Sequence, residues 1–239
     1  VELRAVRNDR LRGVDLVVGA GEIVGIAGMV GSGRTEILET MFGLRGVASG
    51  ELRLTGERVR LRGPRDAIGR GIALVPEDRH VQGLVLGHSI ERNLAMPRLP
   101  ELDDRGIFRR ALSVDRARAA MQILSIKAPG PATEVAALSG GNQQKVVFGR
   151  WRDPTPSLLL LDEPTVGVDV GARDQIYDVV RQAAGNGAGV VVVSSELGEL
   201  VALCDRIAIV ADGVVRATVT RAEAPNEEQL HRLVQEAQA

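Results

Sequence analysis

The chain has 239 residues, of which 44% are hydrophobic and only 2% aromatic, so it can bury one sizeable core built from aliphatic side chains. Its 30 basic and 31 acidic residues leave a net charge of −1, which gives no electrostatic reason to expect a nucleic-acid or anionic-lipid partner. No apolar run approaches the ~20 residues that a membrane-spanning helix needs, and no signal peptide is visible. The single cysteine, Cys204, excludes an internal disulfide, and its apolar neighbours predict a small core residue in a reducing compartment. Because the chain begins at Val1 rather than Met, we expect a fragment of a longer protein.

The first third of the chain is predicted to be mostly β-structure, because short apolar or alternating runs are separated by Gly, Asn and Asp. We expect strands at 2–6, 14–18, 22–27, 50–54, 58–61 and 72–75. The fourth and fifth of these would form a small antiparallel hairpin that turns near 55–57. A short helix is expected at 64–69, where Pro64 suits a first helical turn.

From residue 88 to 151 the pattern changes to a helical period interrupted by prolines, and the remainder alternates helices with strands. We expect helices at 90–95, 114–124, 142–151, 172–184 and 226–239. Four consecutive leucines at 158–161 predict a strand buried on both faces of a parallel sheet, and they follow a loop that holds Pro154. The run at 190–193 predicts a second such strand. Residues 207–210 and 214–219 are expected to close the sheet around an Asp212-Gly213 turn.

A glycine-rich loop lies between the strand at 22–27 and a helix predicted at 37–42. It reads Gly28-Met29-Val30-Gly31-Ser32-Gly33-Arg34-Thr35. The phosphate-binding pattern G-x-x-x-x-G-K-[ST] fits everywhere except at Arg34, where lysine is expected. Glycines allow backbone N–H groups to turn toward phosphate oxygens, and the Thr35 hydroxyl would ligate Mg²⁺. Arginine is longer and planar, so the exchange of Lys for Arg34 is not conservative.

Two further stretches carry candidate chemistry. Asp162 and Glu163 follow the leucine strand at its carboxyl end, where open α/β sheets place their ligands. Ser139-Gly140-Gly141 precedes an amphipathic run, so Ser139 is predicted to cap a helix whose amide end attracts anions.

These motifs, in this order and spacing, resemble the ATPase domain of ABC transporters over nearly the whole chain. Residues 138–143 resemble the signature motif, 158–163 the Walker B strand and 166–169 the D-loop. The resemblance implies an α/β P-loop NTPase fold of ABC type, with a mostly parallel core sheet flanked by helices, a small antiparallel β subdomain and a helical subdomain. It implies a single domain, 1–239, with its core at 1–87 and 152–239 and its helical subdomain at 88–151.

The resemblance also assigns roles to residues and implies ATP and Mg²⁺ as cofactors. The nucleotide-binding residues would be Gly28, Gly31, Ser32, Gly33, Arg34, Thr35 and Glu36. Thr35 and Asp162 would hold the metal, and Glu163 would orient or deprotonate the attacking water. The signature residues Ser139, Gly140, Gly141, Asn142 and Gln143 would serve the nucleotide of a partner domain, with Asp169 in the D-loop.

Three positions depart from the family pattern. Arg34 replaces the phosphate lysine, Glu77 stands where a glutamine senses Mg²⁺ and the permease, and Ser195 stands where a switch histidine holds the γ-phosphate. Removing one oriented donor costs on the order of 2.7–4 kcal/mol of transition-state stabilisation. The chain also has no aromatic residue before residue 30 to stack on adenine. We therefore expect a slow or silent site whose signature motif completes the site of the partner.

The segment Gly31 to Glu36 resembles the second ATPase half of ribose/galactose-type sugar importers, in which two halves are fused. The implied partners are that second half, in a head-to-tail dimer, and a membrane permease, with no nucleic acid and no direct membrane insertion. The implied location is the cytoplasmic side of the bacterial inner membrane, reached through the permease. Arg109, Arg110 and Arg116–Arg118 are interpreted as solvated, with permease contact as the alternative. The three histidines are interpreted as surface residues without a special role.

Three other hypotheses remain open from the sequence. Arg34 and Ser195 could act as working substitutes in a fully competent ATPase. The chain could be a non-transport ABC ATPase that acts on nucleic acid or ribosomes, although its balanced charge argues against this. It could also be a purely regulatory binding module.

Overall fold

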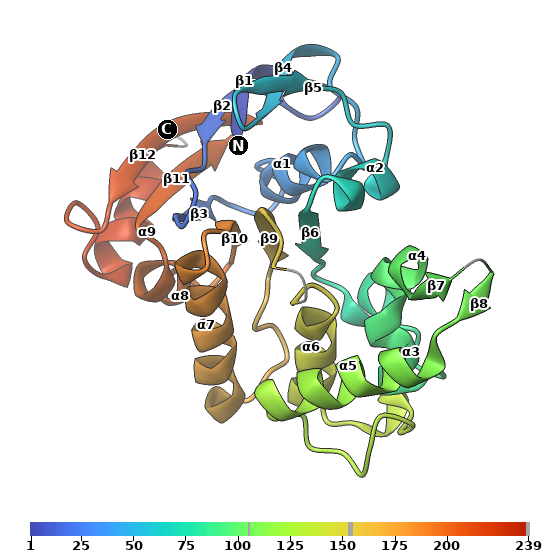
Figure 1. Ribbon diagram of the computed structural model, residues 1–239. Helices are drawn as coiled ribbons and strands as arrows, with labels where there is room; N and C mark the ends of the chain where they lie inside the picture. Colours follow the sequence, from blue (N-terminus) through green and yellow to red (C-terminus); the bar gives the residue numbers. More distant parts are fainter. Residues whose placement is uncertain (105, 153–154, 238–239) are drawn as a thin grey trace. The chain divides into compact units, whose positions relative to one another are not determined.

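The computed structural model describes residues 1–104, 106–152 and 155–237, and the chain forms two compact units (Figure 1). The first unit comprises residues 1–74, 156–164 and 180–239, and the second comprises residues 75–155 and 165–179. Pro154 and the end of the helix predicted at 226–239 lie outside the described residues. The subdomain boundaries expected from the sequence remain a prediction.

A six-stranded sheet forms the centre of the first unit. Its order is β12-β11-β3-β10-β9-β6, and its strands are β3 Ile23–Ala27, β6 Ile72–Val75, β9 Leu158–Asp162, β10 Gly189–Val193, β11 Arg206–Ala211 and β12 Val214–Thr220. β10 pairs in parallel with both β3 and β9, β3 pairs in parallel with β11, and β12 is antiparallel to β11. Every residue of β3, β9 and β10 is buried, which explains why these strands are continuous apolar runs.

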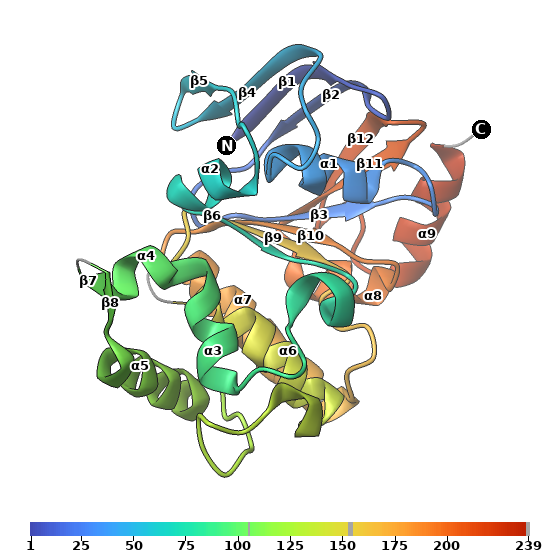
Figure 2. The same cartoon turned by 90° about the vertical axis from the view of Figure 1, so that its right-hand side faces the viewer.

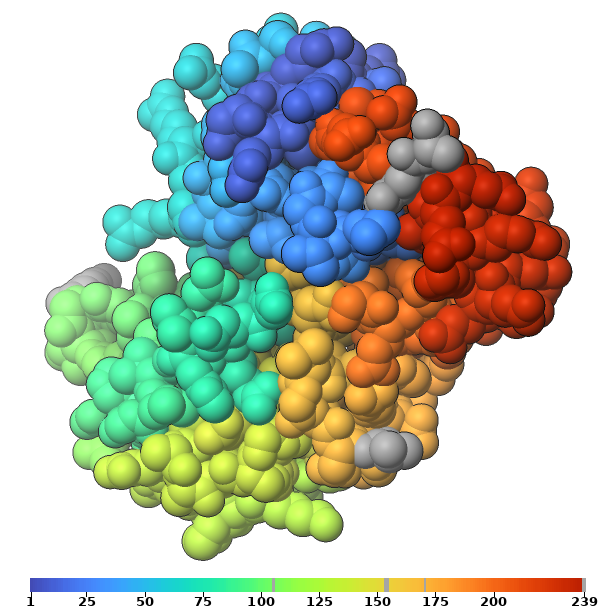
Figure 3. All heavy atoms as spheres, turned by 180° about the vertical axis from the view of Figure 1, so that it is seen from behind, coloured from blue at the N-terminus to red at the C-terminus, as the bar shows by residue number. Residues whose placement is uncertain are grey.

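A second sheet and several helices also belong to the first unit (Figure 2). The second sheet is antiparallel, in the order β2-β1-β4-β5, with β1 Glu2–Arg7, β2 Arg12–Val17, β4 Ser49–Leu54 and β5 Glu57–Val59. The helices are α1 Arg34–Met41, α2 Pro64–Gly69, α8 Leu197–Leu203 and α9 Glu227–Glu236. α1 packs against β9 and β10, whereas α8 packs against β3 and α9. Figure 2 shows α1 and α8 on opposite faces of the six-stranded sheet. β2 contacts β12, and Figure 3 shows the N-terminal strands beside β12 on the surface.

The second unit is mostly helical. It contains α3 Ile90–Ala95, α4 Leu99–Leu102, α5 Arg110–Ile123, α6 Gly140–Gly149, the short hairpin β7 Asp103–Asp104 and β8 Ile107–Phe108, and the start of α7 Val170–Gly185. A π-helical turn, Arg79–Gly83, precedes α3, and short 3₁₀ turns occupy Met96–Arg98 and Val135–Ala137. α3 packs against α5 and α6, so these three helices form the core of the unit.

The predicted α/β fold with a mostly parallel sheet, an antiparallel sheet and flanking helices is confirmed. Several boundaries were wrong by a few residues. The strand expected at 58–61 is Glu57–Val59, because the hairpin turns tightly at Thr55 and Gly56, both at positive φ. The helices expected at 142–151 and 114–124 are Gly140–Gly149 and Arg110–Ile123. α8, the π-helical turn and the β7–β8 hairpin were not predicted.

The interior is aliphatic, as the composition indicates. Cys204 is 1% exposed within it, and burial raises the pKa of its thiol, so it remains a neutral core side chain. None of the helices in the described part of the chain combines the length and the apolar character that a membrane crossing requires.

Candidate functional site

The carboxyl ends of three neighbouring parallel strands gather the main candidate residues of the first unit. Ile26 of β3, Val193 of β10 and Asp162 of β9 lie level in the sheet. The glycine-rich loop, Glu163 and Ser194-Ser195 directly follow these strands. The sheet register therefore brings the predicted phosphate loop, the two carboxylates and Ser195 to one edge, as expected for open parallel sheets.

The backbone of the glycine-rich loop requires glycine at several positions. A Cβ added at Gly28 would lie 2.4 Å from the carbonyl oxygen of Val210. Gly31 and Gly33 have φ values of 82° and 109°, in the left-handed region that favours glycine. The carbonyl of Ser32 accepts a hydrogen bond of 2.8 Å from the amide of Gly213, which fixes the loop to the β11–β12 turn. α1 then begins directly after Gly33, so the loop ends at a helix N-terminus that favours phosphate.

The donor set beside this loop fits Mg²⁺ bound together with phosphate. Thr35 occupies the first turn of α1, and Asp162, at the end of β9, is only 4% exposed; α1 packs against β9. Among the described residues no group of three or more His, Cys, Asp or Glu side chains is arranged to hold a metal. One hydroxyl and one carboxylate instead match the usual Mg²⁺ site, which takes its other ligands from phosphate and water.

Glu36 lies on the same turn but has another neighbour. Its Oε1 is 3.6 Å from Nε of Arg10. Glu36 therefore forms an ion pair at the edge of the loop, and its predicted role in nucleotide binding stays a prediction.

Arg34 points toward the strand ends. Its Nη1 donates a hydrogen bond of 3.0 Å to the carbonyl oxygen of Ser194 and lies 3.8 Å from Oε1 of Glu163. The side chains of Arg34 and Glu163 are only 11% and 8% exposed. Water therefore screens this charge pair less than it would a surface ion pair.

Ser195 engages the other oxygen of the same carboxylate. Its backbone N–H and its hydroxyl both donate to Oε2 of Glu163, each at 3.0 Å. Glu163 itself has a φ of 47°, and its amide donates to the carbonyl of Val193 at 2.9 Å. One oxygen of Glu163 thus accepts two hydrogen bonds, and the other lies near the Arg34 cation; these contacts restrict the position of the carboxylate.

The predicted signature residues begin α6 in the second unit. Ser139 is the N-cap residue, as predicted, but its side chain makes no capping hydrogen bond. Its hydroxyl instead accepts from the Asn142 amide at 2.9 Å, while Asn142 Oδ1 accepts from the backbone N–H of Lys127 at 2.9 Å. A Cβ added at Gly141 would meet the side chain of Ala172 at 3.1 Å, so Gly141 permits close packing against the start of α7.

The remaining predicted residues of the second unit lie on three different elements. Glu77 is exposed on the loop after β6. Asp169 caps the start of α7, because its Oδ1 accepts from the amide of Ala172 at 3.0 Å. Gln143 Oε1 lies 2.9 Å from His80 Nε2, and its amide nitrogen donates to the carbonyl of Val135 at 3.2 Å.

Sequence reasoning missed two residues beside these motifs. The first is His80, which was interpreted as a surface residue without a special role. It is exposed, yet it touches the signature helix. The second is Arg79, whose guanidinium donates to the carbonyl of Val166, 87 positions later in the chain. Their only sequence signal is their position next to Glu77.

Comparisons with known proteins show the family to which the chain belongs. The family model described as ABC transporter matches residues 11–166. The chain is 44% identical over 214 residues to the ribose import ATP-binding protein RbsA of Geobacillus kaustophilus (strain HTA426), covering 90% of this chain and 43% of that protein. It is 41% identical over 219 residues to the galactose/methyl galactoside import ATP-binding protein MglA of Treponema pallidum (strain Nichols), covering 90% and 44%. The chain therefore spans less than half the length of these relatives.

Solved structures show the same fold. The ATP-binding subunit of an ABC transporter superimposes with a TM-score of 0.77 at 23% identity, over 99% of this chain and 98% of that one. A dimeric ATP-binding cassette in a post-hydrolysis state with ADP and Pi superimposes with a TM-score of 0.78 at 23% identity, over 92% and 97%. The family match covers more than half of the chain, and the chain belongs to the ABC transporter family.

Proposed function

We propose that this chain is one ATP-binding half of an ATP-driven importer for a sugar of the ribose or galactose class. Its own pocket would bind ATP with Mg²⁺ and hydrolyse it slowly. Its signature residues would complete the nucleotide site of a second half, which we propose is fused to it. The names of its relatives support the sugar class. We further propose that the chain works at the cytoplasmic side of the bacterial inner membrane, attached through a permease.

The proposal of slow hydrolysis rests on the contacts that Glu163 makes with Ser195 and Arg34. A water molecule is activated by a free oxygen lone pair on a positioned carboxylate. Oε2 of Glu163 already accepts two hydrogen bonds from Ser195, and Oε1 faces Arg34. We infer that the two Ser195 donors and the nearby Arg34 cation restrict the access of water to Glu163 and thereby slow the chemical step.

The remaining residues of the pocket are suited to binding. The amides of the glycine-rich loop would cradle the phosphates, and Thr35 with Asp162 would hold Mg²⁺. Mg²⁺ supplies neutralisation of phosphate charge when it is bound. Arg34 would contribute a forked donor to a phosphate once it leaves Glu163.

Completion of the partner site is the role we infer for the start of α6. Ser139 leaves the helix amides without a side-chain cap of its own, and the positive end of α6 suits a phosphate from outside the chain. A cassette of the same fold is dimeric with ADP and Pi, and we propose a dimer with the head-to-tail arrangement for this chain.

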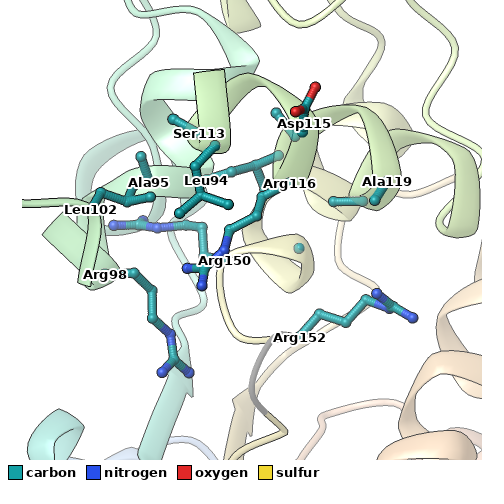
Figure 4. Close-up of a pocket in the computed structure, with 14 residues that line it drawn as sticks. Leu94, Ala95, Arg98, Leu102, Ser113, Asp115, Arg116, Ala119, Arg150 and Arg152 are labelled. Atoms are coloured by element: carbon teal, nitrogen blue, oxygen red, sulfur yellow. The ribbon is translucent and has the colours of Figure 1, made fainter. Parts of the chain in front are cut away.

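A pocket in the second unit is our candidate contact for the permease (Figure 4). Its volume is about 280 Å³, and it combines apolar side chains such as Leu94 and Leu102 with four arginines, Arg98, Arg116, Arg150 and Arg152. Glu101 pairs with Arg98 and Arg116. Burial lowers the pKa of Arg150, whose guanidinium donates to the carbonyl of Gly83. A partner segment with apolar and acidic side chains would fit this lining.

The first experiment measures ATP binding to this chain with and without Mg²⁺, followed by turnover. We expect Mg²⁺-dependent micromolar binding with very slow hydrolysis. Rapid turnover that disappears in Glu163→Gln would instead support a fully competent ATPase. Absence of binding up to millimolar ATP would contradict a working pocket.

The second experiment tests the signature in the assembled transporter. Ser139→Arg places a bulky cation at the start of α6, and we expect it to abolish ATP turnover by the partner half. The control is Thr218→Arg, which places the same cation at an exposed position of β12. Ser195 is also exposed, but its contact with Glu163 makes it unsuitable as a control. Unchanged turnover in Ser139→Arg would favour a regulatory binding module.

A further inference from the structure

We propose that Arg79 is a positioning residue for hydrolysis at the nucleotide site of the partner half. It would act by holding the start of α6 and the loop before α7 in one fixed arrangement. This inference rests on the proposed function, because both segments would face the nucleotide of the partner. Every residue that carries it belongs to the second unit.

Arg79 binds the backbone of the loop before α7. Its Nη1 donates a hydrogen bond of 2.9 Å to the carbonyl oxygen of Val166. Val166 is 42% exposed, so the bond fixes the main chain of a residue that remains on the surface. A charged donor to a carbonyl is stronger than a neutral one, which suits the role of a tether.

The guanidinium also packs against two glycines. A Cβ added at Gly140, the first residue of α6, would lie 3.1 Å from Arg79 Nη2 and 3.1 Å from the carbonyl oxygen of Gly167. A Cβ added at Gly167 would lie 3.3 Å from the same nitrogen. The Arg79 group therefore occupies the space that side chains at both positions would take. Its Nε is buried and has no hydrogen-bond partner in the described part of the chain, so packing as well as hydrogen bonding holds the group.

The backbone that carries Arg79 is itself fastened to α6. Asp78 Oδ1 accepts from the amides of His80 and Val81 at 2.9 and 3.1 Å, which caps the π-helical turn. His80 Nε2 contacts Gln143 Oε1 one turn into α6. Because the Gln143 amide nitrogen already donates to Val135, its oxygen faces His80, and His80 Nε2 is the donor.

The far end of the turn is attached to the same helix. A Cβ added at Gly83 would lie 3.3 Å from the side chain of Val147, and the guanidinium of Arg150 donates to the carbonyl of Gly83. The turn thus contacts α6 near its start, its middle and its end. Arg79 extends this support to Val166 and Gly167 through its hydrogen bond and its packing.

A positioning role predicts a loss of turnover without a loss of folding or of ATP binding. Misplacing a group by about 1 Å costs on the order of a hundredfold in rate. Arg79→Lys keeps the charge but removes the planar fork. We expect it to lower kcat of the assembled transporter at least about tenfold. Arg79→Ala should lower kcat further.

The test compares these variants in the assembled transporter with Arg92→Ala, an exposed arginine of α3 in the same unit. ATP binding to this chain and the Tm are measured in parallel. KM for ATP and binding should stay within about twofold of wild type, and Arg92→Ala should leave kcat unchanged. Arg79→Lys serves if Arg79→Ala fails to fold.

The outcomes separate this inference from the proposed function. Loss of turnover in Ser139→Arg together with unchanged kcat in Arg79→Lys overturns the role of Arg79 alone. Unchanged turnover in Ser139→Arg overturns the proposed function and the inference with it. A fall in kcat that accompanies an equal fall in ATP binding or a broadened melting transition also overturns it, because Arg79 would then be a structural residue only.

Discussion

The Arg34 side chain extends from the phosphate loop toward Glu163, and its Nη1 lies 3.8 Å from Glu163 Oε1. The same nitrogen donates to the carbonyl oxygen of Ser194 at 3.0 Å. Arg34 therefore reaches across two strand ends and neutralises a carboxylate of its own chain. A phosphate that enters the loop must compete with Glu163 for this cation.

The competition predicts that Glu163→Gln strengthens ATP binding. The amide keeps the shape of the side chain but removes the negative charge that attracts Arg34. We expect the affinity for a non-hydrolysable ATP analogue to rise roughly three- to tenfold, which corresponds to the ~1 kcal/mol of an ion pair. Isothermal titration of wild type and variant checks the change.

A double-mutant cycle isolates the pair. In an Arg34→Ala background the gain from Glu163→Gln should fall below about twofold, because the cation that both anions share has been removed. An equal gain in both backgrounds would show that Glu163 acts on the nucleotide directly rather than through Arg34.

The two loop glycines are predicted to differ in their effect on stability. Gly28→Ala should lower the free energy of unfolding by more than about 2 kcal/mol, because the new Cβ would lie 2.4 Å from the Val210 carbonyl. Gly31→Ala should cost only about 1 kcal/mol, the usual penalty of a left-handed φ, since its Cβ would meet nothing within 4 Å. Urea denaturation of both variants measures the difference, and equal costs would contradict this account of the loop.

The sequence allowed the framework of the site to be predicted because its signals are local. The runs at 158–161 and 190–193 are apolar since both faces of their strands are buried, and the glycine spacing of 28–33 follows from the backbone that the loop requires. The aligned ends of β3, β9 and β10 then follow from parallel pairing.

The contacts between distant side chains could not be predicted in this way. Arg79 meets Val166 across 87 positions and His80 meets Gln143 across 63, and no periodicity encodes such pairs. α8 was missed because Gly198 interrupts a short helical pattern, and packing on β3 and α9 stabilises it instead. Ser139 is the N-cap residue of α6, as predicted, but its hydroxyl accepts from the side chain of Asn142 instead of from a helix amide.

The Mg²⁺ dependence of ATP binding should depend on the hydroxyl of Thr35. Thr35→Val keeps the branched shape at the start of α1 and removes the hydroxyl oxygen that would ligate the metal together with Asp162. We expect MgATP affinity to fall about tenfold, which corresponds to ~1.4 kcal/mol, while ATP affinity in EDTA stays unchanged. Thr218→Val, on the exposed surface of β12, is the control. Equal losses with and without Mg²⁺ would place Thr35 in the loop structure rather than in metal binding.

A pH-dependent part of the stability should come from Glu22. Hydrogen bonding from Arg206 is the largest effect that lowers the pKa of Glu22 below its ordinary 4.5, and the amide of Gly19 adds to it against the opposing effect of burial. A carboxylate whose pKa is lowered in the folded state stabilises the fold above pH 4.5. This contribution to stability is lost as the pH falls through the pKa of the folded state. Glu22→Gln should therefore lower the urea midpoint at pH 7, and the gap from wild type should shrink below pH 4.5. The effect should be modest because the side chain of Glu22 is partly exposed.

Glu57→Gln, at an exposed position of β5, should show no such gap at either pH. A gap for Glu22→Gln that stays constant from pH 7 to pH 3 would mean that its charge does not cause the stabilisation.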